Sequence, residues 1–246
     1  LANEEVVNGV CERCGGEVDE SFTIRKMFKY LFSNKNLLLY YFGYFFNSSL
    51  NIMNALNLFV SFYLFNNSMF SMVVMVLSAL PMLVFAALVP KFVAKYDKMK
   101  IYLTCAVLQV ALSIVMWLIG YSNMVLFIVL CVLRAIPQGV MGVMVFMFTP
   151  DCAEYGKFKT GIEAKGITFA IQTFMVKLTG AVSSALSLFL LGVIGWKDVS
   201  QAENFEQLKE LGITQTPETL EGLWLIFIMV PAIGVGLGAI CWMLYR

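Results

Sequence analysis

Long apolar runs separated by short polar or basic turns make up most of the chain after residue 36. A helix of about 20 apolar residues crosses the hydrocarbon core of a bilayer, and each run is long enough to do so. The pattern therefore predicts an all-α, polytopic membrane protein with one six-helix transmembrane bundle over residues 37–246. The six predicted spans are residues 37–65, 70–92, 101–121, 124–148, 166–195 and 223–244.

The composition agrees with this class. Hydrophobic residues make up 60% of the chain and charged residues 13%, proportions that are abnormal for a soluble domain. A net charge of +1, without a basic cluster beside exposed aromatics, argues against a nucleic-acid partner. The chain has no histidine, no nucleophile motif and no carboxylate pair at membrane depth, so we predict neither an enzyme nor a cofactor. Cys11 and Cys14 form a lone CxxC pair, which is too few ligands to predict a metal site.

The distribution of basic residues predicts the topology. Of the 17 Lys and Arg residues, thirteen flank the predicted spans on one side and only Lys197 and Lys209 lie on the other, while Arg134 and Lys177 fall inside spans. In membrane proteins the excess of Lys and Arg lies in cytoplasmic loops. We therefore expect a multi-pass protein of the cell membrane, with both ends of this chain on the cytoplasmic side.

Three asparagines recur on one face of the first predicted span. Asn47, Asn51 and Asn54 stand at i, i+4 and i+7, which brings them into register on a helix. Amides that faced lipid would be costly, and hydrogen bonds to neighbouring helices are one way to satisfy them. Three amides in register favour the wall of a cavity filled by water or by a polar ligand.

Two cationic residues lie deep inside predicted spans. Arg134, in the fourth span, and Lys177, in the fifth, each lie about 15 Å from the nearest end of their helix at 1.5 Å per residue. A charge at that depth costs ~3 kcal/mol or more and is tolerated where it faces a bundle interior or a watery cavity. A purely structural alternative for Arg134 is that it binds backbone carbonyls freed by Pro137.

The loop after the fourth span and the fifth span itself carry two motifs, PDCAEYGKFKTG and AKGITFAIQTFMVKLTGAVSSAL. Together they resemble the loop and eleventh helix of the glycoside-pentoside-hexuronide cation symporters, the melibiose permease-like branch of the major facilitator superfamily. The chain departs from the family pattern in an inverted charge pair, Glu163 and Lys165, and in Lys157, where the family has glutamate. The residues at matching places are Thr149, Pro150, Asp151, Tyr155, Gly156, Lys159, Thr160, Gly161, Gly166, Gln172, Thr173 and Lys177.

The resemblance implies that this chain is the C-terminal six-helix half of a transporter, with residues 1–36 as the remnant of a cytoplasmic central loop. Its partner would be the N-terminal six-helix half, and the two bundles would rock around a substrate site near the bilayer midplane. By analogy with the family, the first, second, fourth and fifth helices line that site and the third and sixth lie outside it. The predicted substrate-binding residues are Asn47, Asn51, Asn54, Arg134, Gln138, Gln172 and Thr173.

The function that the resemblance implies is symport of a sugar or glycoside, coupled to Na⁺ or H⁺. The coupling cation would bind mainly in the N-terminal half, and Lys177 would link its occupancy to sugar binding. Two alternatives stay open. One is a transporter of the same architecture for an anionic or amphipathic cargo, such as a uronide or a lysolipid, held by Arg134 and Lys177. The other is a six-helix membrane scaffold that transports nothing.

The loop between the fourth and fifth spans mixes both signs of charge within fifteen residues. Because helix ends beside it must separate during transport, we predict a cytoplasmic gate of ion pairs there, with a merely solvated loop as the alternative. The predicted gate residues are Asp151, Glu154, Lys157, Lys159, Glu163 and Lys165.

Overall fold

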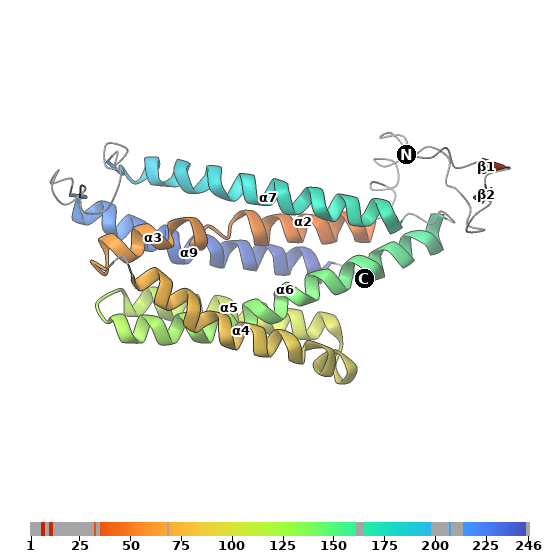
Figure 1. Ribbon diagram of the computed structural model, residues 1–246, viewed down its shortest axis with the longest axis horizontal. Coiled ribbons are helices and arrows are strands. Elements are labelled where there is room, and N and C mark those ends of the chain that lie inside the picture. Colours follow the sequence, from red (N-terminus) through yellow and green to blue (C-terminus); the bar gives the residue numbers. More distant parts are fainter. Residues whose placement is uncertain are drawn as a thin grey trace.

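The structure is a computed structural model that describes residues 6–7, 10–11, 32, 35–67, 69–160, 165–197, 207 and 214–244. Apart from a short antiparallel hairpin, the described elements are helices (Figure 1). These elements are β1 (Val6–Val7), β2 (Val10–Cys11), α2 (Lys35–Ser49), α3 (Met53–Tyr63), α4 (Phe70–Lys95), α5 (Lys98–Ile119), α6 (Met124–Thr160), α7 (Lys165–Val193) and α9 (Pro217–Met243).

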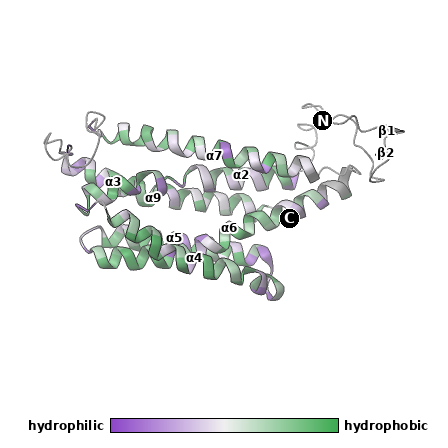
Figure 2. Cartoon of the chain, viewed as in Figure 1, coloured by the Kyte–Doolittle hydropathy of each residue, from purple (hydrophilic) through white to green (hydrophobic). Residues whose placement is uncertain are grey.

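Within the described residues, five helices are long and apolar enough to cross a membrane: α4, α5, α6, α7 and α9. They coincide with the second to sixth predicted spans and confirm a helical polytopic membrane protein. In Figure 2 their surfaces are mostly hydrophobic, and hydrophilic residues gather at the turn between α4 and α5. Long apolar runs were sufficient to place these helices, since in lipid only a helix or a closed barrel satisfies the backbone.

The prediction of one continuous helix over residues 37–65 is wrong, because α2 and α3 are separate helices. The segment between α2 and α3 leaves the α-helical pattern, because Asn51 N donates to Ser48 O (3.3 Å) and Ile52 N to Leu50 O (2.9 Å). Serine and asparagine side chains compete with the backbone for hydrogen bonds, which favours such an interruption. One backbone oxygen at the break is satisfied from another helix, since Ser183 Oγ of α7 donates to Asn51 O at 3.2 Å. Figure 1 shows α3 continuing in the general direction of α2, so the two pieces together make one passage.

The helix α6 is longer than the predicted fourth span. It has 37 residues and continues through Pro137 and Pro150 into the charged segment that we had predicted as a loop. At 1.5 Å per residue it is about 55 Å long, well beyond the roughly 30 Å of a hydrocarbon core. Its C-terminal part therefore projects past the membrane, at the end of the bundle where α7 begins (Figure 1).

Small residues set the closest packing in the bundle. A Cβ added at Gly238 of α9 would lie 2.9 Å from the Gly43 carbonyl oxygen of α2, so only glycine lets these helices approach so far. Trp242 covers this contact, because its Nε1 donates to Tyr40 O (3.2 Å) and its ring stacks on Tyr102 (3.9 Å between centroids). These contacts hold α2, α5 and α9 together. The helix α7 lies along α2 at the edge of the bundle.

Candidate functional site

A pocket of about 220 Å³ opens among α2, α4, α5, α6 and α9. One buried water molecule needs a cavity volume of roughly 10–15 Å³. The pocket is many times larger, so it has room for a ligand with several polar groups. The residues that line it are Tyr44, Asn47, Ser48, Asn51, Met82, Gln109, Gln138, Met141, Gly142, Val145, Phe146, Pro231 and Val235.

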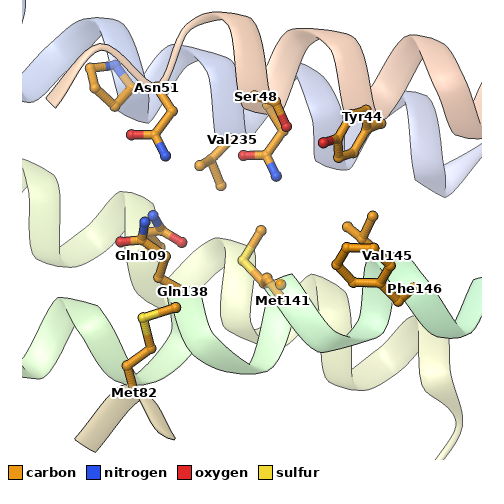
Figure 3. A pocket seen from close by; sticks show the side chains of 13 residues that line it. Tyr44, Ser48, Asn51, Met82, Gln109, Gln138, Met141, Val145, Phe146 and Val235 are labelled. Carbon is orange, nitrogen blue, oxygen red and sulfur yellow. The ribbon is translucent and has the colours of Figure 1, made fainter. Parts of the chain in front are cut away.

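The polar part of this lining consists of neutral side chains. Asn51, at the break after α2, projects toward the side of the pocket that Gln109 of α5 and Gln138 of α6 line (Figure 3). Asn47 and Ser48 of α2 add a further amide and a hydroxyl. None of the described residues that line the pocket is Asp, Glu, Lys or Arg. The break at residues 50–52 helps to place these groups, since irregular backbone at membrane depth is tolerated where it lines a cavity.

Amide side chains suit one kind of ligand. Each amide offers an acceptor oxygen and two N–H donors, and each hydroxyl of a sugar both donates and accepts. The apolar walls, which include Met141 and Val235, can pack against C–H surfaces. An uncharged set of donors and acceptors between apolar walls can orient a polyhydroxylated molecule without a requirement for charge.

The structure brings three of the sequence-predicted residues together in this pocket: Asn47, Asn51 and Gln138. Asn54 does not line it, and its side chain is exposed on α3. The interruption after Ser49 changes the phase of the helix, so the i, i+4, i+7 spacing no longer puts Asn54 beside the other two.

Arg134 lies one helical turn before Gln138 on α6 and is only 3% exposed. Its Nη1 contacts the Met53 sulfur at the start of α3, and its Nε has no hydrogen-bond partner in the described part of the chain. It does not line the pocket. The guanidinium is thus buried next to the break between α2 and α3, beyond the end of the pocket where Gln138 lies.

The α7 residues are placed apart from this pocket, because none of the described residues that line it comes from α7. Gln172 is buried, and its Nε2 has no hydrogen-bond partner among the described residues. Thr173 is exposed and donates to Phe169 O at 3.0 Å, and Lys177 is exposed as well. The roles predicted for Gln172, Thr173 and Lys177 stay predictions.

One residue of the predicted gate has a defined partner. Lys98 Nζ, at the first residue of α5, lies 2.6 Å from Asp151 Oδ2 on α6. Glu154 is exposed on the next turn of α6. The side chains of the remaining four gate residues, Lys157, Lys159, Glu163 and Lys165, lie outside the described part of the structure.

Sequence reasoning missed Gln109. The third predicted span was placed outside the cavity, whereas Gln109 of α5 is buried and lines the pocket. A signal was present, since Gln109 is the one strongly polar residue within an apolar run. Tyr44 and Ser48 were missed too, because a tyrosine or a serine inside a span is common at ordinary helix contacts.

Comparisons with known proteins identify a family and several relatives of this chain. A family model described as MFS/sugar transport protein matches residues 13–246. The lactose permease of Lactobacillus delbrueckii subsp. bulgaricus is 27% identical over 169 residues, 68% of this chain and 27% of the relative. The glucuronide carrier protein homolog of Escherichia coli K12 is 25% identical over 72% of this chain and 36% of the relative. The raffinose carrier protein of Pediococcus pentosaceus is 23% identical over 66% of this chain and 25% of the relative.

The chain thus aligns with about a quarter to a third of the length of these relatives. The family match confirms the resemblance noted in the loop and fifth span, and the family that it names is one of transporters and not of enzymes. Since the match covers nearly the whole chain, the protein belongs to the family of MFS/sugar transport proteins.

Proposed function

We propose that this chain supplies half of a sugar or glycoside transporter and that the pocket among α2, α4, α5, α6 and α9 binds hydroxyl groups of the substrate. The observation that carries the proposal is the neutral lining, in which the amides of Asn51, Gln109 and Gln138 converge inside a membrane-type bundle. The names of the relatives, which refer to lactose, raffinose and glucuronide, support this substrate class.

The proposed mechanism is alternating access, with this bundle and an N-terminal six-helix half rocking around the pocket. Coupling to Na⁺ or H⁺ is part of the proposal. The pocket lining has no carboxylate among its described residues, so the carboxylates that a hard cation requires would come from the other half. Lys177, exposed on α7, is available to face that half.

A specific observation favours a second substrate class, the uronides. Arg134 is buried one turn from Gln138 and forms no ion pair in the described part of the chain. A carboxylate on the substrate would supply the missing negative charge, and one relative is named as a glucuronide carrier homolog. Neither the comparisons nor the site favours a lysolipid cargo or a scaffold without transport.

The test is uptake by this chain produced together with its partner half in lipid vesicles. The substrates are radiolabelled lactose, raffinose and methyl glucuronide, each with and without an inward Na⁺ or H⁺ gradient. Uptake of at least one neutral sugar, accelerated by one of the gradients, is the expected result. Uptake of the glucuronide alone would favour the Arg134 reading, and no uptake of any of the three would overturn the proposal.

A further inference from the structure

The side chain of Gln109 is the most unusual polar group of the pocket. It is 5% exposed, and its amide oxygen Oε1 has no hydrogen-bond partner in the described part of the chain. A buried acceptor without a donor is costly, so polar atoms of this kind are normally paired. Gln109 also lines the pocket, and in Figure 3 its side chain lies on the side of the pocket opposite Asn51.

The backbone of α5 fixes Gln109 in this place. Its buried residues recur along one stripe, and the next polar member of that stripe is Ser113. The Ser113 hydroxyl donates to the Gln109 carbonyl at 2.8 Å and is itself fully buried. Of the buried residues of this helix, only Gln109 lines the pocket. The stripe therefore carries one amide to the pocket from a helix that otherwise packs against its neighbours.

The oxygen Oε1 of Gln109, unpaired among the described residues, determines which kind of ligand group can bind to it. An acceptor oxygen requires a donor, which excludes the carboxylate of a uronide at this position and favours a hydroxyl. A hydroxyl that donates to Gln109 Oε1 still has lone pairs that can accept from another donor of the pocket lining, which also includes the amides of Asn47, Asn51 and Gln138.

We propose that Gln109 is a substrate-binding residue whose Oε1 accepts a hydrogen bond from one particular hydroxyl of the transported sugar. This inference rests on the proposed function and deepens it, because it adds α5 to the helices that contact substrate and assigns this part of the pocket to a neutral hydroxyl. It leaves any acidic group of a substrate to a residue other than Gln109, such as Arg134, which is buried outside the pocket lining.

The test uses Gln109→Met, which removes the amide and keeps a side chain of similar length. The chain is assayed with its partner half in vesicles, on whichever of lactose, raffinose and methyl glucuronide the unchanged protein takes up. Competition by each monodeoxy analogue of that sugar is then measured. The matched control is Ser113→Ala, which alters the same turn of α5 without touching the pocket.

The expected result has two parts. Gln109→Met raises KM about tenfold, as expected for loss of one buried hydrogen bond. It also abolishes the discrimination against one deoxy analogue while discrimination against the others persists, and Ser113→Ala keeps the whole pattern. If Gln109→Met does not reach the membrane, Gln109→Asn is used, since its shorter amide should weaken the same discrimination.

Other outcomes distinguish a failure of the role proposed for Gln109 from a failure of the proposed function. In one outcome the unchanged protein takes up the sugar and Gln109→Met discriminates among the monodeoxy analogues as the unchanged protein does. That result would overturn the role of Gln109 and leave the proposed function intact. The partner of Oε1 would then be a water molecule. A uniform loss of affinity for all analogues would overturn it too, since that is the effect of a structural residue. If the parent transports none of the three sugars, the proposed function fails and this inference fails with it.

Discussion

Lys98 and Asp151 form an ion pair that joins the first residue of α5 to the extended part of α6, with 2.6 Å between Nζ and Oδ2. Both side chains are about one third exposed, at 32% and 39%. An ion pair with that much access to solvent contributes only about 0.2–1 kcal/mol to stability. From its position near the end of the bundle where α6 extends, we expect it to affect the relative movement of helix ends more than folding.

Neutralising this pair should change the rate of transport more than the affinity. We expect Asp151→Asn to alter the maximal uptake rate severalfold with KM changed less than twofold, because neither residue of the pair lines the pocket. Uptake kinetics in vesicles check this. Lys100→Gln, an exposed cation of the same turn, is the control. Unchanged rates in both Asp151→Asn and Lys98→Gln would remove the ion pair from the gate.

The pocket predicts which asparagines and glutamines matter for affinity. Gln138→Leu should raise KM about tenfold, since a lost hydrogen bond in a buried site costs roughly 1.4 kcal/mol. Asn54→Leu should change KM less than twofold, because that side chain is exposed outside the pocket. Sugar uptake at varied concentration measures both. An equal rise of KM in the two variants would favour the uninterrupted asparagine face predicted from the sequence.

Lys177 tests the proposed coupling. We expect Lys177→Leu to abolish accumulation driven by a cation gradient while the protein still inserts into the membrane, because the described part of this chain offers no other exposed cation in the middle of α7. Uptake is compared with and without the gradient. Phe174→Leu, also exposed on α7, should keep the coupling. Normal stimulation by the cation in Lys177→Leu would return that lysine to a structural role.

The orientation in the membrane can be tested with single cysteines. The basic turn between α4 and α5 predicts that Tyr96→Cys is cytoplasmic, and the uncharged turn between α5 and α6 predicts that Asn123→Cys is outside. Both side chains are exposed. A membrane-impermeant maleimide added to intact cells should label Asn123→Cys alone. Labelling of Tyr96→Cys alone would invert the topology.

Stability should depend on the glycines of α9 unequally. A Cβ at Gly238 would lie 2.9 Å from the Gly43 carbonyl oxygen, whereas a Cβ at Gly236 meets nothing within 4 Å. We expect Gly238→Ala to lose about 1–3 kcal/mol of stability through overpacking. Gly236→Ala should be neutral or slightly stabilising, because alanine is the better helix former. Thermal melting in detergent compares the two, and equal melting temperatures would contradict the packing argument.

Hydrophobic length predicted where the helices α4, α5, α7 and α9 lie, because a span must satisfy its own backbone in lipid. It could not predict the interruption at residues 50–52, since an apolar run of this length fits a continuous helix as well as an interrupted one. The hydrogen bond from Ser183 to Asn51 O comes from a helix more than a hundred residues away in sequence. A local pattern holds no information on such a contact.

The candidate site was predicted in part for a related reason. Periodicity shows which residues of one helix share a face, and this brought out Asn47 and Asn51. It does not show how a helix is rotated against its neighbours. The span that holds Gln109 was therefore placed outside the cavity, while Thr173, predicted to bind substrate, lies on α7 and does not line this pocket.

The break between α2 and α3 divides the first membrane passage into two pieces that are held by different contacts. The piece before it is held by the Gly43 contact with α9 and by Trp242. The piece after it follows Asn51 and Ile52, whose backbone N–H groups bond to Ser48 O and Leu50 O instead of continuing the helical ladder. This second piece is packed in its own right, since Ile52, Leu56 and Val60 are fully buried. Asn47 thus belongs to the piece held against α9, Asn51 lies at the joint, and Arg134 contacts the second piece at Met53. The pocket is therefore lined both by a regular helix and by a joint whose carbonyl oxygen is held from α7.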